Sequence, residues 1–411
     1  MKKTRLALAI ATAAMVSTPV LATNGDSLIG LGAQSRAMGG TGTAAFFGSE
    51  NALTNPGLLG KSEGTEFAIG GTLFKPSVKA DSTVAGQTSP TSANDTNIIP
   101  EVSLSTRLSE NLTFGLGIFG SAGMGVDYQD DPKLFKAYSN LQLMKFAPTL
   151  AYNADQFGIG FAPVIQYGSL DINYQNSSGN TVGNGMSSDL GYGFNLGGYF
   201  DITNNLTLGL SYQSAIDMKY KNQITTAASG FNLTGFSDNL EQPAEIKAGV
   251  AFTTGSLMLT ADAKQIKWGS AKGYKDFNWK DQNVFAVGAK YSGNGYWAGI
   301  GANYGDDPIS KLDESKTAAQ GGYKNQATNM FNNVFFPAIV TTHVTVGGGY
   351  SLTKNLAIDG AIVYAPEVNK TINTGAVSGA LTSNNTMAAD ATKEKTTHSQ
   401  IGYTVSLRMN F

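Results

Sequence analysis

The sequence has no cysteine and only two histidines among its 411 residues. Without cysteine, disulfide bonds, thiolate catalysis and thiolate metal ligands are excluded. The histidines, His343 and His398, are predicted to be polar strand or loop residues. A hydrolase that uses His398 with a nearby serine and aspartate is the enzymatic alternative. The acidic pairs and triplets lack the spacing of a calcium loop. We predict no enzyme, no cofactor and no metal site.

Charge is also scarce, and long apolar runs are missing. Charged residues make up 14% of the chain, below the usual ~25%, whereas glycine accounts for 50 residues. After residue 22 no run of 18 apolar residues occurs, which excludes a membrane-spanning helix. A Gly-rich and aromatic-rich chain of this kind can cross a membrane only as a closed β-barrel.

The first 22 residues have the three parts of a secretory signal peptide. Lys2, Lys3 and Arg5 precede an apolar run over 6–16, and small residues stand at the −3 and −1 positions before a cut after Ala22. Removing these residues leaves 25 basic against 30 acidic side chains, so the formal net charge changes from −2 to −5. An acidic chain of this kind is not expected to bind nucleic acid.

The end of the chain shows the clearest strand pattern. Apolar residues at 401, 403, 405, 407, 409 and 411 alternate with small or polar ones, as in a strand between lipid and a polar lumen. Similar segments recur, joined by six tight turns and by seven polar loops at roughly 81–96, 128–139, 176–188, 226–243, 270–279, 307–336 and 373–397. This asymmetry predicts an all-β fold, a 14-stranded antiparallel transmembrane β-barrel over residues 65–411 with both ends on the periplasmic side. The terminal Phe411 resembles that of outer-membrane proteins, where it helps the assembly machinery recognise the barrel.

Ten ionisable residues fall within predicted strands: Glu101, Arg107, Lys145, Glu245, Lys247, Asp262, Lys264, Lys290, Asp359 and Arg408. An Arg or Lys facing lipid at mid-depth costs roughly 2–4 kcal/mol, so most of them should face the lumen. There they can pair with one another, or one or two can receive a ligand carboxylate. The alternation places Glu245, Lys247 and Arg408 inside but leaves the direction of Lys145 open.

One strand is unusually rich in glycine. The segment 115–120, GLGIFG, matches a dinucleotide-binding fingerprint, but no helix follows it, so that function is rejected. A strand that carries Gly115, Gly117, Gly120, Gly123 and Gly125 is weakly paired and prone to bulge or kink.

The stretch 30–60 reads GLGAQSRAMGGTGTAAFFGSENALTNPGLLG, which fits neither a helix nor an alternating strand. With the barrel pattern behind it, the chain resembles the FadL family of outer-membrane transporters for long-chain fatty acids and aromatic hydrocarbons. The resemblance is carried by SRAMGGTG at 35–42, by Asn55-Pro56, and by QPAEIKAG at 242–249, DAKQIKW at 262–268 and YGDDPI at 304–309. Gly57 stands where the family usually has alanine.

The resemblance implies an outer-membrane protein in which residues 23–64 form a hatch inside the lumen. It also implies that the third strand, which carries the five glycines, kinks inward and opens a lateral gap in the wall. A hydrophobic solute would land on apolar loop residues, move to a lumen pocket and leave sideways, without energy coupling. The candidate landing residues are Leu134, Phe135, Tyr138, Met330, Phe331, Val334, Phe335 and Phe336.

The candidate pocket residues are Leu28, Leu31, Arg36, Phe46, Phe47, Arg107, Lys145, Lys247 and Lys264. A fatty acid would need a buried cation among them, whereas a hydrocarbon would need only an apolar pocket, and the sequence leaves this choice open. The expected partners are hydrophobic small molecules, outer-membrane lipid, lipopolysaccharide and the assembly machinery, and the protein is expected to be a monomer. The alternative function is a general diffusion porin or a structural or receptor barrel.

Overall fold

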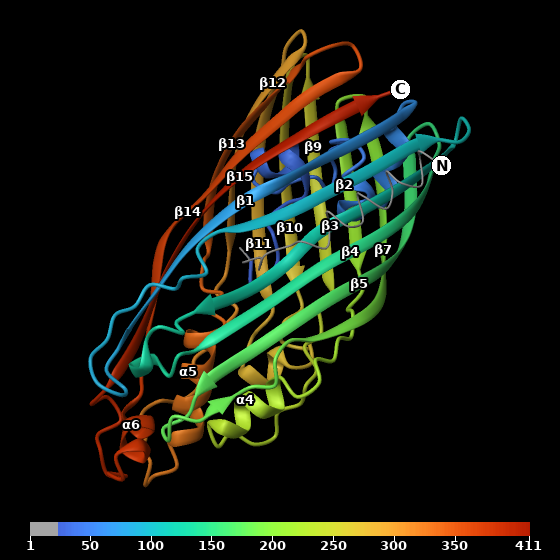
Figure 1. The fold of residues 1–411 in the computed structure, drawn as a ribbon. Helices are drawn as coiled ribbons and strands as arrows, with labels where there is room; N and C mark the ends of the chain where they lie inside the picture. Colours follow the sequence, from blue (N-terminus) through green and yellow to red (C-terminus); the bar gives the residue numbers. More distant parts are fainter. Residues whose placement is uncertain (1–23) are drawn as a thin grey trace, which may run out of the picture.

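The structure is a computed structural model that describes residues 24–411, so the predicted signal peptide lies outside the described residues. Fourteen long strands form one closed antiparallel ring, in which each pairs with the next and β15 returns to β1 (Figure 1). A two-residue strand, β6 (Thr181–Val182), extends the edge of β5. The predicted 14-stranded barrel is confirmed. The long strands are β1 (Thr65–Ser82), β2 (Asn97–Arg107), β3 (Leu112–Asp127), β4 (Tyr138–Asn153), β5 (Phe157–Gln175), β7 (Ser187–Thr203), β8 (Leu206–Gln213), β9 (Glu245–Thr254), β10 (Leu257–Ile266), β11 (Gln282–Ser292), β12 (Tyr296–Gly305), β13 (Thr342–Ser351), β14 (Leu356–Asn373) and β15 (Lys393–Asn410).

The connections are short at one end of the barrel and long at the other. Six tight turns of two to four residues alternate with seven loops at 83–96, 128–137, 176–186, 214–244, 267–281, 306–341 and 374–392. The fourth loop begins earlier than predicted, because β8 ends at Gln213. The loops carry η2 (Pro132–Leu134), α4 (Ile224–Gly230), η3 (Tyr274–Phe277), α5 (Tyr323–Phe335) and α6 (Gly375–Leu381), and Figure 1 places α4, α5 and α6 together at the loop end.

The strands present apolar side chains outward and small or polar ones inward. In β15, Val405 is 55% exposed whereas its neighbour Ser406 is 5% exposed. The same alternation on β4, β5, β7 and β9 exposes residues such as Leu150, Phe161 and Ile246. The exposed apolar belt is the surface that lipid would cover. In the part of the chain that the structure describes, no helix has both the length and the hydropathy of a membrane span.

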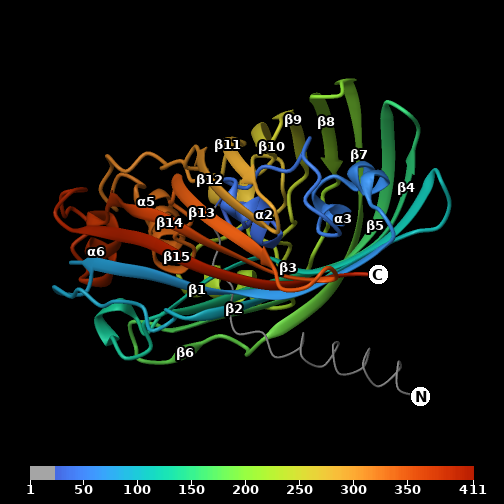
Figure 2. The same ribbon diagram turned by 90° about the horizontal axis from the view of Figure 1, so that it is seen from above.

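Residues 24–64, called here the N-terminal segment, lie inside the ring of strands (Figure 2). The segment contains the short helices α2 (Gly32–Ala37), α3 (Asn51–Thr54) and η1 (Pro56–Lys61), and nearly all of it is buried. Asn55 caps η1, since its Oδ1 accepts from Gly57 N at 3.1 Å. Lumen-facing side chains satisfy its backbone: Thr345 Oγ1 donates to Ala37 O at 2.8 Å, and Asn195 Nδ2 donates to Leu53 O. An irregular chain can therefore stay buried without sheet pairing.

The ladder between β2 and β3 is incomplete. The pairs run from Arg107↔Thr113 to Glu101↔Phe119 and then stop. Directly after this point, the pairing of β3 with its other neighbour, β4, shifts register between Gly120 and Ala122. Beyond it, the edge of β3 pairs with the N-terminal segment: Leu28 N donates to Ser121 O at 3.3 Å and Gly123 N donates to Asp26 O at 2.9 Å. The glycine-rich strand therefore contains the irregularity that its composition predicts.

Candidate functional site

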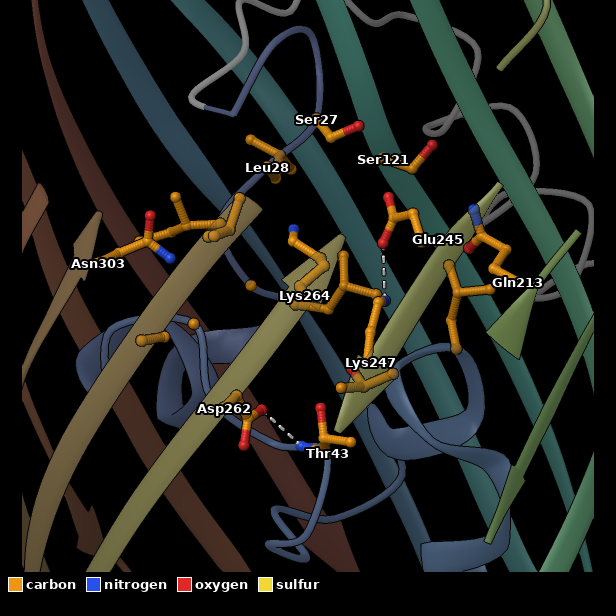
Figure 3. Close-up of a pocket in the computed structure, with 18 of the residues that line it drawn as sticks. Ser27, Leu28, Thr43, Ser121, Gln213, Glu245, Lys247, Asp262, Lys264 and Asn303 are labelled. Atoms are coloured by element: carbon orange, nitrogen blue, oxygen red, sulfur yellow. Dashed lines mark hydrogen bonds and ion pairs between the residues drawn. The ribbon is translucent and has the colours of Figure 1, made fainter. Parts of the chain in front are cut away.

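A cavity of ≈ 70 Å³, the first cavity, lies in the lumen between the N-terminal segment and the inner faces of β4, β9 and β10 (Figure 3). In this measure a water molecule needs roughly 10–15 Å³, so the space fits a few waters or the head of an amphiphile. Its apolar lining includes Leu28, Ile29, Leu31, Leu53, Val284 and Ala286, and its polar lining includes Ser121, Lys145, Gln213, Glu245, Lys247, Asp262, Lys264 and Asn303.

Three lysines from three strands converge on this cavity. Lys145 comes from β4, Lys247 from β9 and Lys264 from β10, and Figure 3 shows the last two beside Glu245. Lys247 Nζ forms an ion pair with Glu245 Oε2 at 3.0 Å. Among the described residues, no hydrogen bond or ion pair reaches the Nζ of Lys145 or Lys264, although Lys145 is only 4% exposed. Two ammonium groups are thus available to a ligand.

The two carboxylates of the cavity already have partners. Glu245 binds Lys247, and Asp262 Oδ2 accepts from the backbone N–H groups of Gly42 (3.0 Å) and Thr43 (2.9 Å). Three lysines against two carboxylates give the lining a formal charge of +1. Gln213 Nε2 and Asn303 Oδ1 are buried without a hydrogen-bond partner among residues 24–411. Asp262 Oδ1 is unpaired as well, and since unpaired buried polar atoms are costly, these groups favour a polar occupant. The formal charge of +1 favours an anionic one.

The structure brings together five of the nine predicted pocket residues. Leu28 and Leu31 supply apolar contacts, and Lys145, Lys247 and Lys264 supply positive charge. The side chain of Lys145, whose direction the sequence left open, points into the lumen. Within residues 24–411, no group of three or more His, Asp or Glu side chains is arranged to hold a metal ion.

The two candidate arginines, Arg36 and Arg107, do not line the first cavity. Arg36, on α2, donates to Glu101 Oε1 at 2.6 Å and to Thr72 Oγ1 at 2.7 Å, so its charge is already neutralised. Arg107 lies at the tight-turn end of β2 and donates to Ser62 O at 2.7 Å. Both arginines fasten the N-terminal segment to the wall.

The two candidate phenylalanines also lie outside the first cavity. Phe47 packs with Met38, Ala44, Ala45 and Ala251, and the Nζ of Lys290 stands 5.2 Å from its ring centroid. Phe46 lines a different cavity near the tight turns. The structure therefore does not bring them together with the five residues of the first cavity, because the segment turns away from that cavity after Thr43.

Seven of the eight predicted landing residues are buried rather than exposed. Phe331 and Phe335 on α5 have no accessible surface, and Phe336, Leu134, Phe135, Met330 and Val334 are buried as well. Phe331 stacks on Phe277 with a centroid distance of 4.9 Å, and Phe231 and Tyr174 complete the cluster, called here the aromatic cap. Tyr138 lies on β4 and is half-buried. The expectation of an exposed landing patch is wrong because the loops pack their aromatic side chains on one another.

Sequence reasoning missed the residues that hold the start of the N-terminal segment. Tyr274 Oη donates to Asp26 Oδ2 at 2.5 Å and Gln242 Nε2 donates to Asp26 Oδ1 at 3.1 Å, while the Trp268 ring covers Gly25. Burial raises the pKa of the Asp26 carboxyl, although these hydrogen bonds lower it. Gln242 and Trp268 belong to the stretches 242–249 and 262–268, which carried the resemblance and could have signalled this contact.

Comparisons with known proteins agree with this architecture. A family profile described as outer membrane protein transport protein (OMPP1/FadL/TodX) matches residues 8–411. The toluene transporter TodX of Pseudomonas putida is 20% identical, with a TM-score of 0.67 over 93% of this chain and 99% of that one. A FadL homologue of Pseudomonas aeruginosa is 15% identical, with a TM-score of 0.68 over 96% of this chain and 100% of that one.

A curated protein matches this chain over a short stretch. The chain is 45% identical over 67 residues to an uncharacterized protein of Chlorobium limicola from the 5′ region of a phosphoenolpyruvate carboxykinase gene. The match covers 16% of this chain and 33% of that protein. The solved relatives share the fold of this chain. The family profile spans almost the whole chain and describes transport proteins of the bacterial outer membrane, so this protein is an outer-membrane transport protein and not an enzyme. The chain belongs to the OMPP1/FadL/TodX family of outer-membrane transport proteins.

Proposed function

We propose that the protein takes up hydrophobic molecules with an anionic head, of which long-chain fatty acids are the fitting class, passively across the outer membrane. The observation that carries this proposal is the pair of cavity-lining lysines, the buried Lys145 and the half-buried Lys264, that no described carboxylate neutralises directly. A carboxylate in the first cavity would accept charge-assisted hydrogen bonds from both.

A plain hydrocarbon fits this cavity less well. Related structures include toluene transporters of Pseudomonas putida and Ralstonia pickettii, which share 20% and 19% identity with this chain. An apolar guest would dehydrate three lysines and offer them no acceptor, which is unfavourable. The charged lining therefore supports an amphiphile over an aromatic hydrocarbon, with the alkyl tail lying against Leu28 and Leu31.

We further propose lateral release between β2 and β3, with the N-terminal segment acting as the hatch. The β2–β3 ladder ends at Glu101↔Phe119, and the next residue of β2, Pro100, has no N–H to donate. Pro100 pairs in register with Gly71 of β1. Gly71 lies nearer the tight-turn end of β1 than Lys75, where the outward-facing residues of β1 become polar, so Pro100 stands at the level of the apolar belt. Residues 26–28 cover the free edge of β3, so their displacement would open a path into lipid.

The two unpaired lysines provide the test. In the variant Lys145→Met/Lys264→Met, we expect the Kd for palmitate to rise at least about tenfold, since two charge-assisted hydrogen bonds are lost. The matched control is Lys290→Met, because Lys290 also lies in the lumen but donates to Gln34 Oε1 at 2.8 Å outside the cavity. Displacement of a fluorescent fatty acid measures binding, and uptake of labelled palmitate by cells measures transport. Equal affinity for palmitate in the double variant and in the control would contradict the proposal.

A further inference from the structure

A hollow of ≈ 770 Å³, called here the outer groove, lies on the lipid-facing side of the wall over β5, β7, β8 and β9. These four strands are consecutive in the ring. The outward-facing side chains that border the groove are aliphatic or aromatic, and Leu210 is the most exposed of them, at 65%. The groove is therefore an indentation in the apolar belt.

The indentation arises because two strands lack bulk at the same level of the wall. The register of the four strands aligns in one outward-facing row Ile159, Gly198, Leu210 and Ala248. In this row β7 contributes no side chain and β9 only a methyl group. Two residues away along β7, in either direction, stand Leu196 and Phe200, which close the groove at its two ends.

Contacts inside the lumen explain why position 197 is a glycine but not why position 198 is one. A Cβ on Gly197 would lie 2.1 Å from Asn55 Oδ1, so the N-terminal segment leaves no room for it. A Cβ on Gly198 would point to the outer face, where only Gly158 O, at 3.0 Å, and Ile159 Cα, at 4.0 Å, come near it. The missing side chain thus leaves space on the lipid side alone.

The groove has the position and the length of an acyl chain in one leaflet. It begins beside the tight turns, at Phe157 and Phe200, and on β7 it extends four residues away from the turn, to Leu196. At about 3.3 Å per residue this is about 13 Å along the strand, comparable with one half of the ~30 Å hydrocarbon core. The tight turns are at the periplasmic end, so the groove lies in the inner leaflet.

The turns at the periplasmic end of the groove are acidic or neutral. Residues 154–156 read Ala-Asp-Gln and residues 204–205 read Asn-Asn, so neither turn has a basic side chain, and Asp155 is exposed. Lys61, which reaches the same end of the barrel, is already paired with Asp201 at 2.7 Å. This end of the groove therefore repels an anionic head and attracts an ammonium group.

We propose that the outer groove binds one phospholipid of the inner leaflet that has an ammonium head, with an acyl chain over Gly198 and the ammonium beside Asp155. A second copy of the chain fits less well, because a two-fold interface would place the same hollow opposite itself. On the lumen side, a Cβ on Gly57 would lie 2.7 Å from Gly198 Cα, so η1 packs directly against this part of the wall. The bound lipid would support the wall from the other side.

The test counts the phospholipids that stay bound to the protein. The chain is reconstituted in vesicles of equal parts phosphatidylethanolamine and phosphatidylglycerol, extracted in a mild detergent and weighed by native mass spectrometry. We expect the wild-type chain to retain one lipid, with a preference for the ethanolamine head of up to about fivefold, the range of an exposed ion pair. Gly198→Leu fills the groove and should lose this lipid. The matched control is Ala298→Leu, which adds the same side chain at an exposed outward position of β12, outside the groove.

Two more variants keep the test decisive. Ala248→Leu fills the groove from β9 and should also lose the lipid, so it replaces Gly198→Leu if that variant does not fold, as judged by heat-modifiable migration on a gel. Asp155→Lys should keep the lipid but reverse the preference toward phosphatidylglycerol. Its control is Glu110→Lys, which makes the same change of charge in the turn between β2 and β3, outside the groove.

Each outcome decides the proposal. Equal retention by the wild-type chain and the two groove-filling variants refutes the site, and an equal loss in Ala298→Leu refutes its location. An unchanged head preference in Asp155→Lys refutes the recognition of the ammonium group. Added palmitate should leave the phospholipid in place. If palmitate displaces it, or if the wild-type chain is a dimer that Gly198→Leu separates, the occupant is a free fatty acid or a second copy and the proposal is overturned.

Discussion

The buried ion pair between Arg36 and Glu101 should hold the N-terminal segment against the barrel wall. The guanidinium donates to Glu101 at 2.6 and 2.9 Å and to Thr72 at 2.7 Å, and the two side chains of the pair are 3% and 5% exposed. Removing one partner of such a pair leaves an uncompensated charge and costs about 3–5 kcal/mol. Arg36→Met should therefore raise the population with a released segment about 100- to 4,000-fold.

The assay is the labelling rate of a cysteine at position 49, because Ser49 Oγ lies 2.7 Å from Ser103 Oγ of β2 and is protected while the segment is docked. The control is Lys61→Met, whose pair with Asp201 is about one-quarter exposed and contributes up to about 1 kcal/mol, or about fivefold in rate. The double variant Arg36→Met/Glu101→Gln should recover most of the docking, since neither charge remains. The single variants Arg36→Met and Glu101→Gln each give a fold-increase in labelling rate. If the rate of the double variant rises by the product of these two increases, the reasoning from uncompensated charge is refuted.

Three further predictions concern single positions. Gly39→Ala should undock the segment, because φ is +74° and its Cβ would lie 2.5 Å from Ala302 O; a normal labelling rate at position 49 would contradict this. Phe331→Ala should cost about 3–5 kcal/mol in the aromatic cap and speed proteolysis within the loop 306–341. An unchanged digestion rate would argue against the cap. Because burial raises the pKa of Asp26, docking of residues 24–28 should be tightest below about pH 4 and weaken as the pH rises through the raised value. Labelling of Ser27→Cys, normalised to Ser49→Cys, should increase over that range, and Asp26→Asn should remove the increase.

The sequence predicted the barrel well because its signals are local. Alternation in β15 and turn residues such as those after β11 depend on neighbours along the chain, and the glycines of β3 weaken that strand wherever it lies. Inward positions such as Glu245 and Lys247 followed from the same alternation.

The site was harder to predict because its contacts join distant parts of the chain. Nothing near Arg36 shows that α2 will aim it at Glu101, 65 positions away. The apolar residues of α5 were predicted to be exposed because they lie in a polar loop. Their burial depends instead on contacts with other loops, such as those of Phe331 with Phe231 and Phe277. Alternation could not orient Lys145, since apolar residues occupy both faces of β4. Its register with the buried Phe119 of β3 and Gln166 of β5 in the closed barrel places it on the lumen face.

The unequal lengths of the strands set how far the aromatic cap stands from the membrane. On β1 the outward side chains are apolar up to Leu73 and polar from Lys75 to Asp81, and Lys75 pairs with Ile401, the corresponding last apolar position of β15. The remaining seven residues of β1 rise about 3.3 Å each along the strand, so the tilted wall continues more than 10 Å beyond the hydrocarbon. Asn333 of α5 is anchored to that extension through Glu394, at 2.8 Å. The cap is thereby raised well beyond the hydrocarbon layer, and a solute would meet the protein in water before it meets the hydrocarbon.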